Sequence, residues 1–281
     1  MILLADSGST KTDWLLLDED GQQVTRFASV GFNPFYQSQE VIAEGLRTEV
    51  VPNVSGPLRE VHFYGAGCAD ETTSRPARDA LDTAFPAAAI AVHSDLLAAA
   101  RGLCGREAGI ACILGTGSNN CLYDGEKIVN NIGSLGFWLG DEGSGGYLGK
   151  RLVVHYLHGE LPAELNEAFH HAFPDVARLS VLDRAYKQPF PNRYFATFAL
   201  FLTQHLAHPF VELLVQNAFR VFLNTYVVRH PESGSLPVHF TGSVAHYFEL
   251  VLREVMVEKS LKLGSIQKSP MPGLIQYHAA S

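Results

Sequence analysis

The sequence predicts an α/β protein of two halves, each containing a mixed sheet with helices. Short strand-like segments alternate with helical ones, which favours parallel strands joined by helices. The succession of strand, hairpin and glycine-rich loop occurs twice along the chain. Of the 281 residues, 47% are hydrophobic and 18% are charged, so the chain can bury a large core. This composition excludes a disordered tail or a coiled coil.

The first half of the chain begins with an antiparallel meander. Residues 2–5, 13–17 and 23–29 have strand composition and are separated by turn-forming residues. Helices and strands then alternate, which predicts a parallel extension of the same sheet. The expected helices are 38–50, 74–84 and 96–103, and the expected strands are 61–64 and 89–93.

The second half repeats this order and then becomes helical. A strand at 109–114 is followed by a hairpin and by a helix from about Gly143. Helices with apolar residues at three- and four-residue spacing fill 163–229. The hairpin strands are 119–123 and 127–132, the last short strand is 238–240, and the helix after it runs to 258.

We place the domain boundary near residue 105, which gives domains 1–105 and 106–281. No serine-rich or proline-rich linker separates them, so the boundary is expected to be a hinge between packed domains. The last helix is expected to pack back on the first domain.

Charge and cysteine content narrow the class of protein. The formal net charge is -8 and there is no basic run, so nucleic acid and anionic membranes are poor partners. The chain starts directly with a strand rather than a signal peptide, and its longest apolar tract, 195–215, is interrupted by polar residues and a proline. The cysteines form no Cys-x-x-Cys pair and are expected to be reduced, mostly buried thiols in a cytoplasmic protein.

A first candidate phosphate loop lies between the first two strands, from Asp6 to Thr12. A tight turn here can point backbone N–H groups and hydroxyls at an anion, while Asp6 holds a solvated Mg²⁺. A plain hairpin turn is the alternative, because Gly-Ser-Thr turns are common. The candidate phosphate ligands are Gly8, Ser9, Thr10 and Lys11.

Two further loops have similar chemistry. One follows the strand that opens the second half, and the other ends a strand and opens a helix, where a helix N-terminus can meet phosphate. The first of these loops and the Asp6–Thr12 loop occupy equivalent positions of the repeat, which rarely arises by chance. The candidate residues are Gly115, Thr116, Gly117 and Ser118 in the first loop and Thr241, Gly242 and Ser243 in the second.

In that order, the three loops resemble the phosphate-1, phosphate-2 and adenosine motifs of the actin-like ATPase superfamily that includes hexokinase. The closest likeness is to the N-acetylglucosamine kinase and BadF/BadG/BcrA/BcrD ATPase family. It covers most of the chain and is most specific between Gly115 and Lys150. The resemblance implies two ribonuclease H-like domains of the actin and hexokinase type around an ATP cleft.

Asp95 is the candidate catalytic residue. It follows a short strand and opens a helix, so an N-cap role for Ser94 or Asp95 is the simpler reading from the residues alone. The family resemblance favours catalysis, because the matching aspartate is the general base at the sugar hydroxyl. Phosphoryl transfer needs one such carboxylate, together with positioning and charge neutralisation.

Four residues are candidates for binding the sugar. Asn33 can donate to and accept from a hydroxyl, but a turn-forming Asn-Pro pair explains it equally well. Asn119 and Asp141 resemble sugar-contacting positions of amino-sugar kinases. Trp138 either stacks on a pyranose face or fills the core, and we favour the former.

The paired histidines at 155 and 158 and at 205 and 208 lack a companion ligand at a spacing that would complete a zinc site. Glu142 is expected only to favour a helix dipole. The phenylalanine-rich helices between Tyr194 and Phe222 form core or a dimer surface, so a homodimer is one expected assembly.

The resemblance implies a cytoplasmic kinase that uses ATP and Mg²⁺ to phosphorylate a hydroxyl of an N-acetylated amino sugar. N-acetylglucosamine, converted to N-acetylglucosamine 6-phosphate, is the first expectation. N-acetylmuramate kinase and a BadF-type ATPase that acts on a partner enzyme are the alternatives, with a non-catalytic sugar sensor as a third. The scattered cysteines disfavour the iron–sulfur-linked activators of the BadF type.

Overall fold

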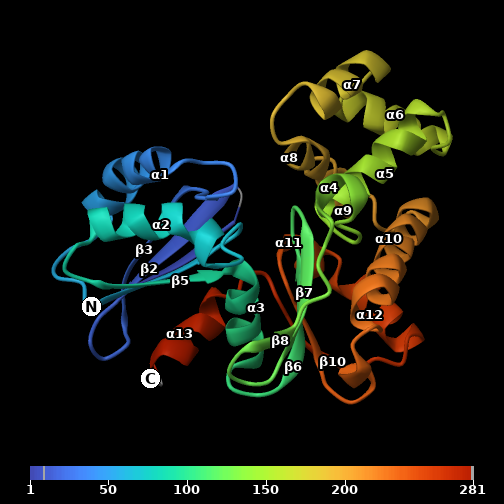
Figure 1. Cartoon of the computed structure of the whole chain (residues 1–281). Coiled ribbons are helices and arrows are strands. Elements are labelled where there is room, and N and C mark those ends of the chain that lie inside the picture. The colour runs from blue at the N-terminus through green and yellow to red at the C-terminus, as the bar shows by residue number, and fades with distance from the viewer. Residues whose placement is uncertain (9, 280–281) are drawn as a thin grey trace. The chain divides into compact units, whose positions relative to one another are not determined.

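The computed structural model describes residues 1–8 and 10–279, which form two compact units (Figure 1). Unit 1 comprises Met1–Arg106, Gly125–Lys127 and the segment from Pro270 onwards. Unit 2 comprises Glu107–Asp124 and Ile128–Ser269. None of the helices in the described ranges is both long and apolar enough to cross a membrane.

Unit 1 is built on a five-stranded sheet in the order β3-β2-β1-β4-β5. The first three strands pair antiparallel, and β1-β4 and β4-β5 are parallel. The predicted meander and its parallel extension are therefore confirmed. The strands are β1 (Ile2–Ser7), β2 (Lys11–Leu17), β3 (Gln23–Val30), β4 (Glu60–Gly65) and β5 (Ala89–Ser94).

Helices cover both faces of this sheet, with α1 (Gln39–Gly45) and α2 (Glu71–Ala84) on one side and α3 (Asp95–Cys104) and α13 (Met271–Ala279) on the other (Figure 1). Successive strand residues point to opposite faces. Accordingly, Leu3 belongs to the core under α1 and α2, whereas Leu4 packs with Met271 of α13.

Two helices of unit 1 differ from the prediction in their bounds. The helix expected at 38–50 is α1 continued by a π-helical turn, η1 (Leu46–Val50), and a 3₁₀ turn, η2 (Val51–Asn53). Helix α2 begins three residues earlier than expected, because Asp70 caps it. The Asp70 carboxylate accepts from the Thr73 N–H at 2.8 Å, and the Thr73 hydroxyl accepts from the Asp70 N–H at 3.0 Å, which is a reciprocal cap.

Unit 2 is built on a second five-stranded sheet in the order β10-β9-β6-β7-β8. Strands β6 and β7 pair antiparallel, as do β7 and β8, while β9 lies parallel to both β6 and β10. This is the arrangement of unit 1, so the predicted repeat is confirmed. The strands are β6 (Gly109–Leu114), β7 (Ser118–Tyr123), β8 (Ile128–Asn130), β9 (Val238–Thr241) and β10 (Leu263–Gln267).

Three expectations for unit 2 are wrong. The strand near 238–240 is not the last one, because β10 follows and pairs with β9. Strand β8 is shorter than the predicted 127–132. The helix expected to run from Gly242 to Glu258 is interrupted at Phe248, which leaves the helical region with φ -107° and ψ 26°.

The remaining helices of unit 2 supply most of its core. The predicted apolar spacing is confirmed in α10, where Val211, Leu214, Val215 and Phe219 are buried. Figure 1 shows α6 and α7 beyond α5, away from the sheet of this unit. The helices are α4 (Gly136–Leu139), α5 (Gly145–Leu157), α6 (Ala163–Ala172), α7 (Arg178–Tyr186), α8 (Pro191–Ala196), α9 (Ala199–Gln204), α10 (Pro209–Phe222), α11 (Ser243–Tyr247) and α12 (Glu249–Glu258), with the short turns η3 (Leu223–Val227) and η4 (Pro231–Gly234).

Candidate active site

The turn between β1 and β2 exposes its glycine and one hydroxyl. The Gly8 N–H donates to the Lys11 carbonyl at 3.0 Å and closes the turn. Gly8 and Thr10 are exposed, whereas Ser9 lies outside the described residues. The hydroxyls of Ser7 and Thr12 are buried and lie 2.7 Å apart, so they hold the loop together. Thr10 is therefore the described hydroxyl best placed to meet an anion.

Asp6 lies directly opposite Asp13 in the β1-β2 ladder. Side chains of directly paired residues point to the same face with Cβ atoms about 5 Å apart, so two carboxylates meet there. Lys11 pairs with Asp13 at 2.7 Å and neutralises part of this charge. Asp13 was not among the predicted site residues, although the length of the turn and the alternation of strand residues would have indicated it.

This pair of carboxylates fits a hydrated Mg²⁺. Magnesium in phosphate sites keeps several waters and uses one or two protein carboxylates. In the part of the chain that the structure describes, no group of three or more His, Cys, Asp or Glu side chains is arranged to hold a metal. Asp6 and Asp13 are the residues that would hold this ion through its waters, because they face each other in the β1-β2 ladder.

Asn33 lies in the loop after β3 and is buried. Its side-chain oxygen accepts from the Phe35 N–H at 3.0 Å, which is the turn expected of an Asn-Pro pair. Gly67 approaches this amide so closely that a Cβ would lie 2.2 Å from the Asn33 Oδ1. The turn role of Asn33 is confirmed, and its contact with sugar stays a prediction.

Asp95 is the first residue of α3, but it does not cap the helix. The cap is Ser94, whose hydroxyl accepts from the Leu97 N–H at 3.2 Å. Burial raises the pKa of the Asp95 carboxyl to about 6, although the N–H groups of Leu96 and Asp95 itself act in the opposite direction. A carboxylate with a pKa near the working pH has the property required of a general base.

The candidates of unit 1 lie at one edge of its sheet. Ser7, Gly65 and Ser94 are neighbours in the register of β1, β4 and β5, so these parallel strands end together. Ligands of parallel α/β sheets commonly bind at this carboxyl edge. The Thr10 carbonyl also accepts from the Gly31 N–H at 3.2 Å, which ties the Asn33 loop to the same edge.

The glycine turn of unit 2 is fixed to the start of α5. Within the turn, the Gly115 N–H donates to the Gly117 carbonyl at 3.0 Å. The N–H groups of Gly145 and Gly146 donate to the carbonyls of Gly115 and Thr116 at 2.8 and 3.0 Å. The first turn of α5 thus holds the conformation of the predicted phosphate-2 loop.

The structure also brings the predicted adenosine motif to this turn. Thr241 pairs with Ile113 in the β9-β6 ladder. Gly242 follows with φ +115°, and a Cβ on it would lie 2.3 Å from the Leu114 carbonyl oxygen. Ser243 then begins α11. The two motifs, 126 residues apart from Gly115 to Thr241, are therefore in backbone contact.

Two hydroxyls in these motifs are buried and unsatisfied. The Oγ of Ser118 and the Oγ1 of Thr241 have no hydrogen-bond partner among the described residues. Leaving a buried donor or acceptor unpaired costs about 1–3 kcal/mol, so such groups in a native fold call for an explanation. Hydroxyls are suitable partners for phosphate and ribose oxygens, so this part of unit 2 fits a nucleotide.

Asp141 lies against the same turn. Its carboxylate accepts from the Ser118 N–H at 3.3 Å and from the Ser134 hydroxyl at 2.9 Å. Its backbone has φ 58°, a left-handed conformation that aspartate tolerates better than most residues. Burial raises the pKa of Asp141, although the hydrogen bonds from Ser134 and Ser118 oppose the shift. Ser134, which orients this carboxylate, carries no recognisable signal in the sequence.

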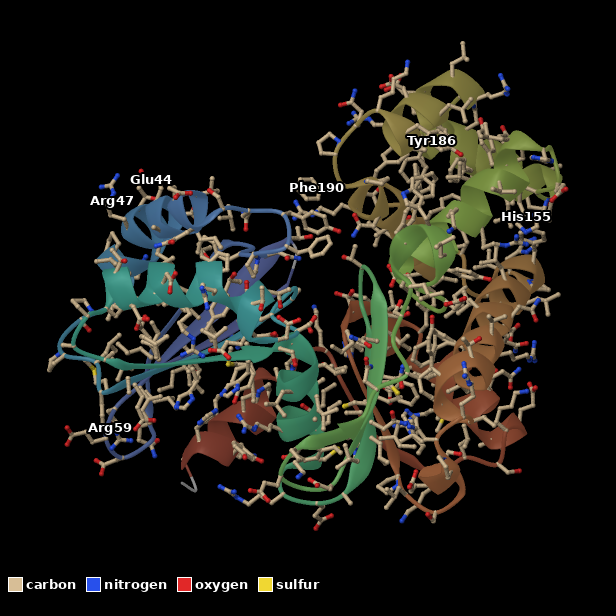
Figure 2. The ribbon with its side chains drawn as sticks, in the orientation of Figure 1. Glu44, Arg47, Arg59, His155, Tyr186 and Phe190 are labelled. Carbon is tan, nitrogen blue, oxygen red and sulfur yellow. The ribbon has the colours of Figure 1, made fainter. Side chains whose placement is uncertain are left out.

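The other two predicted sugar residues have partners within unit 2. The Asn119 Oδ1 accepts from the Asn120 N–H at 2.9 Å and from the Asn131 Nδ2 at 3.0 Å. Trp138 is 49% exposed, so it does not fill the core. Its ring stacks on Tyr186, labelled in Figure 2, with centroids 5.5 Å apart and planes 10° apart.

Glu142 has a more specific role than the expected dipole effect. It lies before Ser144, the residue that caps α5, and accepts from the Tyr226 hydroxyl at 2.5 Å. Its neighbour Asp141 faces the glycine turn, so the two adjacent carboxylates serve different parts of unit 2.

Two units with the same strand order, each carrying a glycine-rich turn after its first strand, define the actin-like, two-domain fold of sugar kinases. The chain is 45% identical to a candidate N-acetylglucosamine kinase from Porphyromonas gingivalis, with a TM-score of 0.94, and the match covers 100% of this chain and 99% of the other. The chain therefore belongs to the N-acetylglucosamine kinase family.

Two more distant structures support the fold. A candidate N-acetylglucosamine kinase from Chromobacterium violaceum is 19% identical with a TM-score of 0.76, and the match covers 98% of both chains. A ROK family glucokinase from Streptomyces griseus, in complex with glucose and AMPPNP, is 15% identical with a TM-score of 0.58, and the match covers 99% of both chains. No protein-family model and no curated protein sequence matches the chain.

Proposed function

We propose that the protein is an ATP-dependent kinase that converts N-acetylglucosamine to N-acetylglucosamine 6-phosphate. The observation that carries this proposal is the 45% identity, over the whole chain, to the candidate N-acetylglucosamine kinase of Porphyromonas gingivalis. Phosphoryl transfer needs groups that bind the phosphates and a general base, and we assign these roles to the two glycine turns and to Asp95.

The nucleotide is assigned to the two glycine turns and the adenosine motif. The backbone N–H groups of Gly8 and Gly117 and the hydroxyls of Thr10 and Ser118 are proposed to bind the phosphates. Thr241, Gly242 and Ser243 are proposed to bind the adenosine part. The unsatisfied hydroxyls of Ser118 and Thr241 support this assignment, because a bound nucleotide would supply the missing partners.

Mg²⁺ is the expected metal, and Asp6 with Asp13 is proposed to hold it through water. When bound, the ion neutralises charge on the transferred phosphoryl group. The ion pair between Lys11 and Asp13 neutralises part of the charge of the two carboxylates. Lys11 is accordingly assigned to the loop rather than to direct contact with phosphate.

Asp95 is proposed to be the general base. Its carboxylate accepts the proton of the attacking sugar hydroxyl while the oxygen forms a bond to phosphorus and the bond to ADP breaks. Ser94 supports this role indirectly, because it caps α3 and leaves the Asp95 carboxylate for chemistry.

The sugar is assigned to Asn33, Asn119, Trp138 and Asp141. Amide and carboxylate groups can bind sugar hydroxyls, and an exposed aromatic ring can cover the apolar face of a pyranose. Trp138 and Tyr186 together offer a wider aromatic surface than Trp138 alone. We further propose a cytoplasmic location, where ATP is available, and a homodimer as the assembly.

A coupled assay of ADP release across a panel of sugars tests the proposal. We expect release that depends on N-acetylglucosamine, weaker activity with N-acetylmannosamine and glucose, and a rate lowered by roughly 10² to 10⁴ in Asp95→Asn. A preference for N-acetylmuramate would assign the other amino-sugar kinase activity. Release of ADP that is independent of every sugar would instead support an ATPase, and sugar binding without release would support a sensor.

A further inference from the structure

The last strand of unit 2 ends on a glutamine whose side-chain oxygen is unsatisfied. Gln267 is the final residue of β10, the edge strand of the sheet (Figure 1). Its Oε1 atom is buried and has no hydrogen-bond partner among the described residues. Leaving a buried acceptor unpaired costs free energy, so such an atom in a native fold calls for an explanation. A bound molecule that supplies the missing donor is one explanation.

Gln267 lies beside Thr241 of the predicted adenosine motif. The two residues pair in the parallel ladder of β10 and β9. Paired residues of neighbouring strands point to the same face of a sheet, and such strands lie about 4.8 Å apart. The Thr241 hydroxyl is also buried and has no partner among the described residues. Two unsatisfied polar groups therefore stand next to each other at the end of this sheet.

Both side chains point away from the helical core of unit 2. Phe240 is buried in that core, and its paired residue Ile266 packs against the same core. Successive residues of a strand face opposite sides of the sheet, so Thr241 and Gln267 lie on the other face. The row continues to Ile113, which pairs with Thr241 and stands two positions before the phosphate-2 turn. Two strand spacings, about 10 Å, thus separate Gln267 from the strand that carries this turn.

The preceding polar pair on these two strands is satisfied internally. The Nδ1 of His239 accepts from the Ser265 N–H at 3.1 Å and lies 3.0 Å from the Ser265 hydroxyl. A threonine hydroxyl could likewise donate to a glutamine oxygen on the neighbouring strand. Thr241 and Gln267 do not form that bond, because each of these oxygens lacks a partner among the described residues. The fold therefore pairs its polar groups up to this row and leaves the last row unpaired.

Hydrogen bonds attach the end of β10 to the adenosine motif. The Gly242 N–H donates to the Gln267 carbonyl at 3.1 Å. The next residue, Lys268, donates from Nζ to the hydroxyl of Tyr247, at the end of α11, at 2.9 Å. The segment that follows Thr241 thus fixes the position of Gln267.

The chemistry of Oε1 selects the part of a nucleotide that it can bind. The side-chain oxygen of glutamine is a carbonyl oxygen, which only accepts, so its partner must donate. Ionised phosphate oxygens are acceptors and do not qualify. The two ribose hydroxyls and the 6-amino group of adenine are donors. A nucleotide would therefore meet Gln267 with its nucleoside part.

We propose that Gln267 is a further nucleotide-binding residue, whose Oε1 accepts a hydrogen bond from a donor of the nucleoside beside Thr241. This inference rests on the proposed function, which assigns the adenosine part to Thr241, Gly242 and Ser243. Gln267 takes no part in phosphoryl transfer. It determines specificity, because a nucleotide that lacks the donor would leave the buried oxygen unpaired.

Calorimetric titrations with ADP and three analogues test the proposal. The analogues are 2′-deoxy-ADP, 3′-deoxy-ADP and purine riboside 5′-diphosphate, which lacks the 6-amino group, so each lacks one donor. Diphosphates are used because they bind without phosphoryl transfer. We expect the parent protein to bind one analogue roughly tenfold more weakly than ADP, the effect of leaving a buried acceptor unpaired. A weakened deoxy analogue identifies a ribose hydroxyl as the donor, and a weakened purine analogue identifies the adenine amino group.

Two variants connect this preference to the glutamine side chain. Gln267→Met keeps the unbranched shape but replaces the amide with a weakly accepting sulfur. Its affinity for ADP should fall roughly tenfold, and ADP should no longer be preferred over the weakened analogue. Gln267→Glu keeps an accepting oxygen, so it should retain the preference, although its charge repels the phosphates and weakens all four ligands.

Gln216→Met is the matched control. Gln216 is a half-buried glutamine of α10 in the same unit, and its Oε1 accepts from the Arg220 Nη2 at 3.2 Å. The control variant should keep the affinities of all four ligands. It should unfold at a lower denaturant concentration than the parent, because Arg220 loses an acceptor. Gln267→Met should unfold at the same or a higher concentration than the parent, because it removes an unsatisfied oxygen.

Several results would overturn the proposal while leaving a nucleotide site in place. These are equal affinities of the parent for all four ligands, an unchanged affinity of Gln267→Met for ADP, and a loss in that variant by the same factor for every ligand. Failure of the parent protein to bind ADP at all would refute the proposed kinase together with this inference. The two kinds of failure are distinguishable, because the first occurs in a protein that binds ADP.

Discussion

Gly242 lies so close to Leu114 that the carbonyl oxygen of the leucine occupies space that any larger residue at 242 would need. The contact joins the end of β6 to the start of α11 without a side chain between them. The relative position of the two glycine-containing motifs of unit 2 is thus set by backbone, which is stiffer than a side-chain contact.

Gly242→Ala should therefore be strongly destabilising. The added Cβ would lie 2.3 Å from the Leu114 oxygen, and φ +115° is unfavourable for alanine. We expect a loss of more than about 2 kcal/mol in the free energy of unfolding, measured by denaturant titration. Gly234→Ala is the control, because no atom lies within 4 Å of its Cβ. Equal stability of both variants would contradict the close contact.

Thr241→Val should weaken nucleotide binding without lowering the free energy of unfolding. The Thr241 hydroxyl is buried without a partner, so replacing it with a methyl group should leave the free energy of unfolding unchanged or higher. Affinity for an ATP analogue, measured by calorimetry, should fall roughly tenfold if the hydroxyl binds the nucleotide. Thr12→Val is the comparison, because it removes hydrogen bonds to Ser7 and Val30 and should destabilise the fold. Unchanged affinity in Thr241→Val would remove this hydroxyl from the nucleotide site.

Asp95→Asn should lower kcat by roughly 10² to 10⁴ while leaving the affinity for sugar nearly intact. In the parent protein, kcat should fall as the pH drops through about 6, because the base is protonated below its pKa. Steady-state rates over pH 5 to 9 check both points. Asp70→Asn removes a carboxylate from another helix start in the same unit and keeps a good cap, so its rate should be normal. A near-normal rate for Asp95→Asn would exclude Asp95 from the chemistry.

The same substitution should stabilise the fold at high pH. The pKa of Asp95 is raised in the folded protein above its ordinary value of 3.8, so folding favours the protonated form. Ionisation of Asp95 therefore lowers the free energy of unfolding as the pH rises from 3.8 to about 6. Asparagine does not ionise, so the variant avoids this loss. We expect Asp95→Asn to be more stable than the parent by about 1–3 kcal/mol at pH 8 and similar at pH 4. A variant that is less stable at pH 8 would show that burial of the charge is not the dominant effect.

Asp6→Ala should raise the Mg²⁺ concentration needed for half-maximal turnover by roughly tenfold, the usual effect of losing a group that binds a metal through water. The measurement is a Mg²⁺ titration of the initial rate at fixed ATP. Asp18→Asn, in the next hairpin turn, removes one charge while keeping the oxygen that accepts from the Asp20 and Gln22 N–H groups. An unchanged metal dependence in Asp6→Ala would refute the phosphate-1 assignment.

The local pattern of the sequence was sufficient to predict the two sheets and their repeat, but it missed β10. Residues Leu263–Gln267 include Gly264 and Ser265, so alternation of apolar residues is weak. The strand is stabilised by parallel pairing with β9 instead. The repeat could have indicated this strand. The first half has five strands, so the second half should have a fifth strand too, after the helix expected to end at residue 258.

The sequence indicates candidate site residues where a motif is continuous, but it cannot indicate residues that meet only in three dimensions. Asp13 becomes part of a carboxylate pair through the register of β1 and β2. Tyr64 and His278 are hydrogen-bonded although they are 214 residues apart in the sequence. No periodicity or spacing relates such residues, so these contacts could not be predicted from the chain.

The assignment of α13 to unit 1 has a consequence for how the nascent chain folds. Strand β1 emerges from the ribosome before unit 2, but the helix that packs on Leu4 and Ile2 is synthesised only after the whole of unit 2. Until then, one face of the first sheet lacks part of its cover and can form wrong contacts. Unit 2 is expected to complete its folding first, so the order in which the domains mature is the reverse of the order in which they begin.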